Sequence, residues 1–240
     1  MQAWGRRLLV RLGLTAGRCP VCGRLRDNGH GPLCTICAHE LRPRLGGYCP
    51  RCGLFFGAET DPPHLCADCR LHPRPWDRLL FHNRHEGPLR KLILNYKFND
   101  ALHVSKLLQH FALAAFERGG PSRPTLILPV PLHRKRLTWR GYNQSLELAR
   151  AIAGKHGVRI DTRALTRTRN TIPQTHVEAG HRRRNIKGAF AVDTKRIQGK
   201  SVLLVDDVLT TGATLEECAK ILRKAGATSV EVLVLSVAKQ

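Results

Sequence analysis

The chain has 240 residues, with 40 lysines and arginines against 18 aspartates and glutamates, and a formal net charge of +22. That length allows one domain with a full hydrophobic core and a small module beside it, and 42% hydrophobic residues exclude a disordered chain. The charge favours an anionic partner such as nucleic acid, an anionic membrane surface or a phosphorylated small molecule, although an arginine-rich proteome would give the same excess.

The N-terminal segment predicts a short helix and no export signal. Leu8, Leu9, Leu12 and Leu14 fit a short amphipathic helix. Arg11 interrupts the apolar stretch, and no convincing cleavage site follows, which argues against a secretory signal. No apolar run in the chain reaches the length of a membrane span.

Eight of the nine cysteines form four Cys-x-x-Cys pairs in the first 69 residues. As a disulfide, such a pair closes almost no loop, but its two thiolates can bind one tetrahedral zinc ion. We therefore predict structural zinc, two ions in all, and a reducing, cytoplasmic location. The candidate ligands are Cys19, Cys22, Cys34, Cys37, Cys49, Cys52, Cys66 and Cys69.

The order of the pairs bears on which four cysteines share a zinc ion. "CPVCG" (19–23) and "CPRCG" (49–53) form a near-repeat, each followed by a plain Cys-x-x-Cys pair. Sequential pairing gives two successive ribbons, whereas a cross-braced arrangement would join the first and third pairs. The repeat favours sequential pairing. Residues 1–75 are therefore predicted to be a double zinc ribbon with a short N-terminal helix.

The run "LHPRPWDR" (71–78) predicts a connector that Trp76 could dock, and residues 78–240 predict alternating strands and helices. Continuous apolar strands alternating with helices are typical of an α/β fold whose parallel sheet is covered on both faces. In such sheets the site lies beyond the carboxyl ends of the strands. The predicted strands are 79–83, 124–131, 189–193, 200–208 and 230–237, and the predicted helices are 87–98, 104–120, 141–157 and 214–227.

The segment "SVLLVDDVLTTGATLEECAK" carries the clearest site signal. Asp206 and Asp207 end a buried strand, and "TTGAT" leads into a helix. Free amides at the helix start and the threonine hydroxyls suit a phosphate, whereas carboxylates need hydroxyl donors or a cation such as Mg²⁺. Phosphoribosyl pyrophosphate (PRPP), with a 5′-phosphate, a cis-diol and a metal-bound diphosphate, satisfies both ends. The expected phosphate-binding residues are Thr210, Thr211, Gly212, Ala213 and Thr214.

"VLLVDDVLTTGAT" resembles the PRPP-binding motif of type I phosphoribosyltransferases. The resemblance implies that Asp206 and Asp207 are the catalytic and ribose-binding pair. Purine-salvage members usually carry a carboxylate where Thr210 stands, so this chain fits the branch that resembles orotate or amido phosphoribosyltransferases.

Further motifs resemble the ComF family, the ComFC/GntX-like proteins. They are the cysteine pairs, "LILPVPLHRKRLTWRGYNQSLELARAIA" (126–153) and "QTHVEAGHRRRNIKGAF" (174–190). The resemblance implies a double zinc ribbon before a type I phosphoribosyltransferase-like domain. It also implies a role in DNA uptake and natural competence, single-stranded DNA as a partner, and a competence helicase or another DNA-processing protein as a further partner.

"PVPLHRKR" (129–136) follows a strand, and its place predicts a loop whose backbone amides and Arg134, Lys135 and Arg136 bind diphosphate. The alternative is a solvated basic turn. "RGYNQS" (140–145) is expected to begin a helix near that loop. Tyr142 could stack on a base or cover the core, and Lys97 could face the ligand or lie along the protein surface. The residues expected at PRPP here are Pro131, Leu132, Arg134 and Arg140.

"RTRNTIPQTHVEAGHRRRNIKG" (167–188) is too polar for a core element and fits the flap that closes over PRPP in this fold. The ComF resemblance points to Gln174, Arg182 and Asn185, with Val177 and Gly180 as departures. We expect Arg182 at PRPP. We expect contacts to diphosphate or DNA from Gln174, Arg183, Arg184, Asn185 and Lys187.

Two functions remain open from the sequence. The first is an enzyme that transfers the ribosyl 5-phosphate group of PRPP to a nitrogen nucleophile, or that runs this reaction backward on a nucleotide. The second is a DNA-binding accessory protein that senses PRPP or a nucleotide without turnover, because this fold can bind ligand without catalysis. Aromatic residues are few, so DNA binding is expected to be mostly electrostatic and salt-sensitive.

Overall fold

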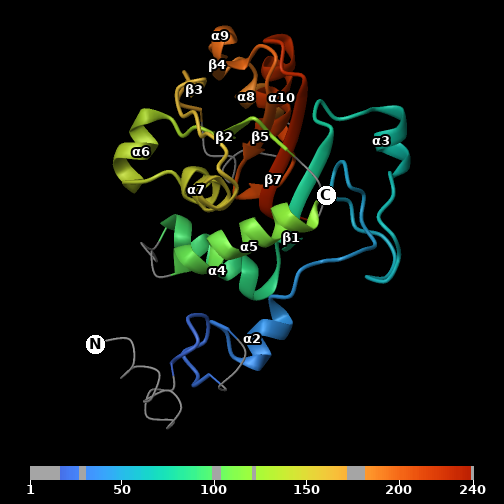
Figure 1. The fold of residues 1–240 in the computed structure, drawn as a ribbon, viewed down its shortest axis with the longest axis vertical. Helices are drawn as coiled ribbons and strands as arrows, with labels where there is room; N and C mark the ends of the chain where they lie inside the picture. Colours follow the sequence, from blue (N-terminus) through green and yellow to red (C-terminus); the bar gives the residue numbers. More distant parts are fainter. Residues whose placement is uncertain (1–16, 27–30, 99–103, 121–122, 172–181, 239–240) are drawn as a thin grey trace.

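A computed structural model of the chain describes residues 17–26, 31–98, 104–120, 123–171 and 182–238 (Figure 1). The expected N-terminal helix, Gln174, Val177 and Gly180 lie outside these residues. No helix of the described residues is long and apolar enough to cross a membrane.

A five-stranded parallel sheet forms the centre of the molecule, with the order β1-β7-β5-β2 and β6 paired to β7 (Figure 1). Its strands are β1 (Arg78–Arg84), β2 (Leu126–Pro129), β5 (Ser201–Val205), β6 (Val208–Leu209) and β7 (Ser229–Val237). The predicted strand 200–208 is two strands, β5 and β6, separated by Asp206 and Asp207. The amide of Asp206 still donates to Leu233 O at 2.9 Å.

The four predicted helices are present as α4 (Gly87–Phe98), α5 (Ser105–Arg118), α7 (Gln144–His156) and α10 (Ala213–Lys224). The predicted strand 189–193 is β4 (Phe190–Val192), which pairs antiparallel with β3 (Leu165–Arg167). The sequence did not predict several short helices, because their few residues give no helical periodicity. They are α2 (Thr35–Glu40), α3 (Ala67–Leu71), α6 (Arg134–Arg140), α8 (Arg182–Ile186) and α9 (Thr194–Ile197).

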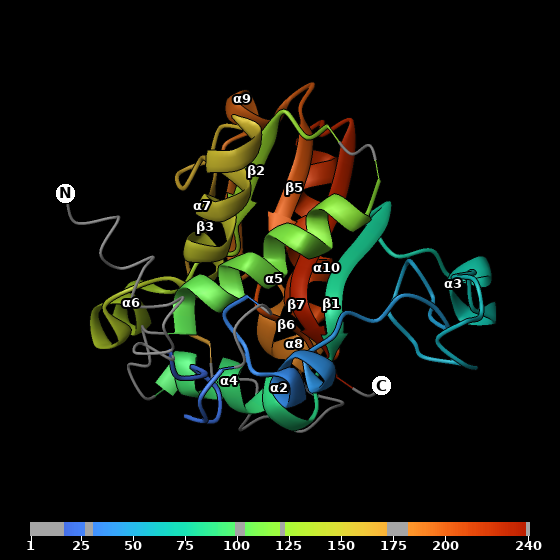
Figure 2. The same ribbon diagram turned by 60° about the horizontal axis from the view of Figure 1, so that its bottom comes forward.

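Helices cover both faces of the sheet, as the continuous apolar strands predict. Helices α5 and α7 pack on one face, and α5 crosses the strands in Figure 2, while α10 packs on the other. Successive residues of one strand enter opposite cores, with Leu203 on the α5 side and Leu204 on the α10 side. The carboxyl ends of β2 and β5, which run parallel as neighbours, therefore meet at one edge of the sheet.

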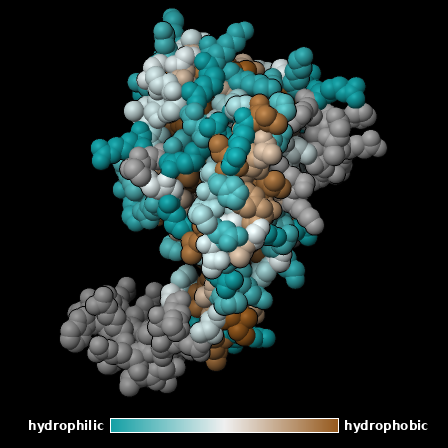
Figure 3. Space-filling model, turned by 90° about the vertical axis from the view of Figure 1, so that its right-hand side faces the viewer, coloured by the Kyte–Doolittle hydropathy of each residue, from teal (hydrophilic) through white to brown (hydrophobic). Residues whose placement is uncertain are grey.

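The cysteine-rich part packs against strand β1 of this sheet and against helix α4. The second ribbon, which holds the cysteines at 49, 52, 66 and 69, contacts β1. There Leu79 N donates to Pro50 O at 2.9 Å, and Tyr48 packs edge-on to Phe81. Trp76 of the connector is buried, and its indole Nε1 donates to Arg51 O at 2.7 Å. In the first ribbon α2 contacts α4. On the face shown in Figure 3, hydrophobic residues lie between hydrophilic ones.

Candidate functional site

The two aspartates lie at the carboxyl end of β5, in the wall of a cavity of about 460 Å³. Asp206 Oδ1 accepts from Ser145 Oγ at 3.0 Å and from the backbone amide of Asp207 at 2.9 Å. Asp207 is 8% exposed, and its Oδ1 lies 2.8 Å from Lys97 Nζ. The lysine therefore faces the site, which decides between the two placements that the sequence left open for it.

The loop after β6 forms the next part of the wall and leads into α10. Gly212 has φ +79° as the N-cap of that helix, a conformation that glycine adopts readily. A Cβ on it would lie 3.4 Å from Leu209 Cδ1, so the loop is closely packed. The hydroxyl of Thr211 is buried without a hydrogen-bond partner among the described residues. A long helix with its N-terminus at a cavity provides backbone amides and a dipole that favour an anion.

Basic side chains line a further part of the cavity, namely Arg136, Arg140 and Arg167. Arg136 donates to Thr171 O at 2.6 Å, and Arg140 donates to Gln144 Oε1 at 2.9 Å. Burial lowers the pKa of Arg136, Arg140 and Arg167 from its ordinary value, and neighbouring arginine charge lowers that of Arg136 and Arg167 further. Crowded, poorly solvated cations of this kind gain free energy when an anion binds beside them.

The cavity brings together most of the residues expected to bind PRPP. Pro131 and Leu132 line it, as do Thr210 and residues 212–214 of the loop. Arg134 is exposed on the short helix α6 and Thr211 lies behind the loop, and neither is part of the cavity wall. The segment expected to be a diphosphate loop is helical from residue 134, and of the basic contacts expected here Arg136 and Arg140 line the cavity whereas Arg134 does not.

The segment expected to be a flap is described only at its two ends. Arg167 lines the cavity and donates to the hydroxyl of Thr171. Arg184 and Lys187 are exposed and Asn185 is half-buried, and none of the three lines the cavity. Arg182 and Arg183 belong to α8. Ile186 is buried in the core under α10. One residue of this segment therefore belongs to the core, although the segment as a whole was expected to be too polar for it.

Several side chains at the site were not predicted as ligand contacts, namely Ser145, Phe98 and Trp139, whereas Arg136 and Arg167 lie in segments that were expected to contact diphosphate. Ser145 lies two residues after Asn143. The side chain of Asn143 caps α7 and donates to Val130 O at 3.1 Å. The motif "RGYNQS" was therefore the signal for it. Tyr142 packs on Tyr96 at 5.2 Å between ring centroids and donates to its carbonyl, so it covers the core and does not face the cavity.

The eight paired cysteines form two clusters in sequential order. Cys19, Cys22, Cys34 and Cys37 make one, and the remaining four, at positions 49, 52, 66 and 69, make the other, with the sulfur atoms of each cluster within 4.8 Å of one another. Cys22 Sγ lies 3.6 Å from Cys34 Sγ, and Cys52 Sγ lies 3.7 Å from Cys66 Sγ. Tetrahedral zinc with Zn–S bonds near 2.3 Å places its sulfurs about 3.8 Å apart. The geometry fits two Cys₄ zinc sites.

Comparison with known families matches both parts of the chain. A double zinc ribbon domain matches residues 13–70, and a phosphoribosyl transferase domain matches residues 143–240. A Salmonella typhi protein named "DNA utilization protein YhgH" is 36% identical over 220 residues, covering 90% of this chain and 95% of that protein. The chain belongs to the ComF family.

Two other ComF relatives carry competence in their names. The Haemophilus influenzae "Competence protein F" is 31% identical over 224 residues, covering 90% of this chain and 94% of that protein. The Bacillus subtilis "Competence protein ComFC" is 25% identical over 215 residues, covering 85% and 83%. The ComF fold in this chain is thus a parallel sheet with flanking helices preceded by a double zinc ribbon region, as the sequence predicted.

The pKa of Asp206 gives this ComF chain a testable pH dependence. Burial and the charge of Asp207 raise that pKa from 3.8 to about 7. Between these values the folded protein holds a proton that the unfolded chain has released, so this group's contribution to stability is lost as pH rises from about 4 to about 7. The free energy of unfolding of Asp206→Asn, relative to that of wild type, should therefore increase as pH rises over this window. Urea denaturation at pH 5, 6, 7 and 8 measures it. Parallel profiles for the two proteins would contradict the shift.

Proposed function

We propose that this chain binds PRPP in the cavity at the carboxyl end of β5. The observation that carries the proposal is one cavity lined by an acidic pair, a helix-initiating loop and a cluster of arginines. A ligand that joins a cis-diol, a 5′-phosphate and a diphosphate would meet a group of complementary chemistry at each wall.

In this proposal each wall has its own task. The carboxylates of Asp206 and Asp207 accept from the ribose hydroxyls, and Thr210 with residues 212–214 binds the 5′-phosphate. Arg136, Arg140 and Arg167 lie where the diphosphate would be. The carboxylate pair also has the hard oxygen ligands that Mg²⁺ prefers, and the ion would supply positive charge to the diphosphate. Lys97 would keep the charge of Asp207 balanced before ligand binds.

The reaction that suits these groups is transfer of ribosyl 5-phosphate from PRPP to a nitrogen nucleophile. The bond from C1 to the diphosphate oxygen breaks, and a bond from nitrogen to C1 forms. Arginines beside the diphosphate stabilise the negative charge that develops on it as it leaves. The alternative remains a protein that binds PRPP as a signal, with the same contacts and no turnover.

We place this chemistry in DNA uptake and the use of incoming single-stranded DNA. The names of the relatives support this role, and the charge of +22 suits a nucleic-acid partner. A competence helicase is a further candidate partner. The eight cysteine thiols must stay reduced to bind zinc, which requires a reducing compartment, so we propose the cytoplasm. We also keep the proposed division into a zinc-ribbon part at 1–75 and a phosphoribosyltransferase part at 78–240.

Diphosphate release distinguishes the enzyme from the sensor. The zinc-loaded protein is incubated with PRPP and Mg²⁺, alone and with nucleobases, ammonia or single-stranded DNA, and diphosphate is measured. Release that depends on one nitrogen nucleophile, and that is lost in Asp206→Asn/Asp207→Asn, supports the enzyme. PRPP binding with no release above the protein-free control supports the sensor.

A further inference from the structure

Two aromatic side chains stand exposed at the cavity. Trp139 is 71% exposed and Phe98 is 49% exposed, and both line the cavity. Within the described part of the chain they are the only aromatic residues among the large hydrophobic side chains with high exposure. Leaving two such rings in water forgoes the favourable free energy of burying them. Their place at the same cavity suggests that a ligand covers them.

The helix that carries Trp139 is held firmly from its other sides. In α6 the amide of Gly141 donates to Leu137 O at 2.8 Å and closes the C-terminal turn. Arg136 ties the helix to Thr171, and Arg140 ties it to Gln144. None of the seven residues of α6 is buried, so these polar contacts hold the helix in place. Trp139 is therefore presented to solvent from a fixed backbone.

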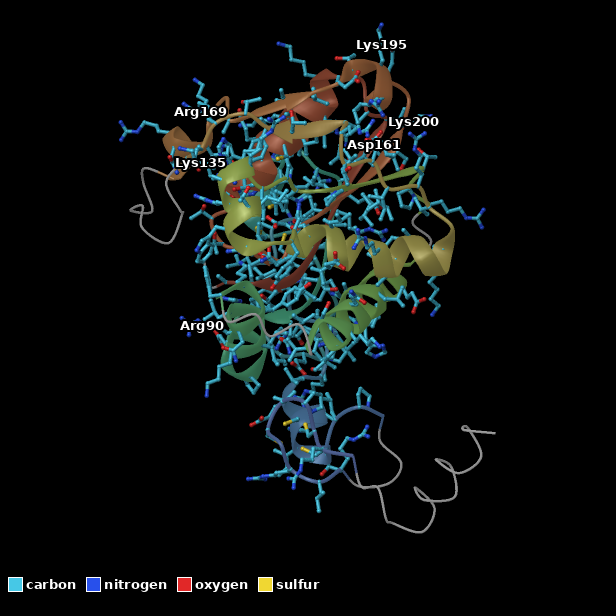
Figure 4. All side chains as sticks on the ribbon, turned by 90° about the vertical axis from the view of Figure 1, so that its left-hand side faces the viewer. Arg90, Lys135, Asp161, Arg169, Lys195 and Lys200 are labelled. Carbon is cyan, nitrogen blue, oxygen red and sulfur yellow. The ribbon has the colours of Figure 1, made fainter. Side chains whose placement is uncertain are left out.

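The charge around the two rings is positive. Helix α6 carries Arg134, Lys135, Arg136 and Arg140 and no acidic residue. The guanidinium of Arg140 lies 5.2 Å from the centre of the Phe98 ring. In Figure 4, Lys135 and Arg169 lie along one edge of the molecule, and Arg90 lies lower on that edge. Exposed rings among cations match a ligand with flat apolar faces joined by phosphates.

We propose that the exposed face of α6 is a platform on which Trp139 stacks a base of single-stranded nucleic acid at the mouth of the cavity. Arg134 and Lys135 contact the neighbouring phosphates. A single strand is the fitting occupant because its bases can turn a free face to the ring, whereas duplex bases are stacked on one another. The inference rests on the proposed function, which it deepens by naming the surface and the side chain on which a single strand would bind beside the PRPP cavity.

The test compares two labelled strands that differ only in their bases. Fluorescence anisotropy measures binding of a 12-nucleotide oligothymidylate and of a fully abasic 12-mer with the same phosphates. Stacking of one base on an aromatic ring is expected to tighten binding about 5- to 150-fold. Wild type should therefore prefer the oligothymidylate by this factor, and Trp139→Ala should lose the preference. Trp139→Phe, which keeps a ring, should retain most of it.

Two control variants separate stacking from charge and from general surface effects. Leu71→Ala removes an exposed hydrophobic side chain from α3 and should bind both strands as wild type does. Arg134→Ala/Lys135→Ala should weaken both strands alike and reduce the dependence of affinity on salt. Trp139→Ala should leave that salt dependence unchanged.

The proposal is overturned if wild type does not bind the oligothymidylate, if Trp139→Ala binds it with wild-type affinity, or if a 12-base-pair duplex shows the same Trp139-dependent gain. Sedimentation that changes from dimer to monomer in Trp139→Ala, with unchanged strand affinity, would instead assign the surface to a second copy of the chain. Calorimetry of wild type with PRPP keeps the two proposals apart. If wild type binds PRPP but Trp139→Ala does not change the affinity for the oligothymidylate, the platform alone is rejected.

Discussion

Replacing both aspartates, in the variant Asp206→Asn/Asp207→Asn, is expected to abolish PRPP binding. Asparagine keeps the size of each side chain but removes the charge that attracts the hydroxyls and Mg²⁺. Hydrogen bonds to charged groups contribute roughly 1.5–3 kcal/mol each, so losing two should weaken binding about 100-fold or more. Isothermal titration calorimetry with PRPP and Mg²⁺ measures the change.

The variant should stay folded, because an amide oxygen remains beside Lys97 and Ser145 and a like-charge pair is removed from a poorly solvated site. Asp193→Asn is the matched control. Asp193 caps α9, the short helix that precedes β5, at the other end of the strand from the site, and asparagine is an equally good cap. It should bind PRPP as wild type does. Unchanged PRPP affinity in the double variant would falsify the assignment of the acidic pair.

Removing zinc is expected to unfold the cysteine-rich part and to weaken PRPP binding as well. The second ribbon is connected through the connector to the loop at 210–214, the proposed phosphate site. Arg74 forms an ion pair with Glu216 in the first turn of α10. A Cβ on Gly212 would lie 3.7 Å from Trp76 Cη2. The indole Nε1 of Trp76 donates a hydrogen bond to Arg51 O in the ribbon. Loss of this support should weaken PRPP binding about tenfold, the effect of roughly 1.4 kcal/mol.

Metal analysis of the untreated protein should find two zinc ions per chain, and less than one would contradict the ribbons. After chelation, hydrogen exchange should rise first in the two cysteine clusters and then in the loop at 210–214. Trp76→Ala is the informative comparison, since it should lower PRPP affinity while both zinc ions stay bound. Chelated protein that binds PRPP with full affinity would show that the loop does not depend on the ribbon.

The sequence predicted the parts of the fold that have a strong local signal. The apolar run before Asp206 can only be a buried strand in this context, and four Cys-x-x-Cys pairs leave little choice of chemistry. Helix α6 was missed because none of its residues is buried, so no apolar periodicity marks it. The place of Lys97 could not be decided, because a helical pattern shows which residues share a face but not that Asp207 lies opposite, 110 positions later in the chain.

The lining of the cavity was predicted within single segments, whereas the meeting of distant segments was not. The loop at 210–214 is continuous and lies at the cavity as expected, with Thr211 behind the wall. Arg136 and Arg167 come from different segments, and both reach Thr171, a convergence that no local pattern reveals. The exposure of Trp139 is equally invisible, since a tryptophan in a sequence is more often buried.

Calorimetric titration of the zinc-loaded wild-type protein with PRPP and Mg²⁺ at pH 8 tests the central claim most directly. At that pH Asp206 is ionised, because its pKa is raised only to about 7. The account predicts saturable binding of one PRPP per chain that weakens as pH falls through 7. Absence of binding by a folded protein with two zinc ions per chain would contradict it.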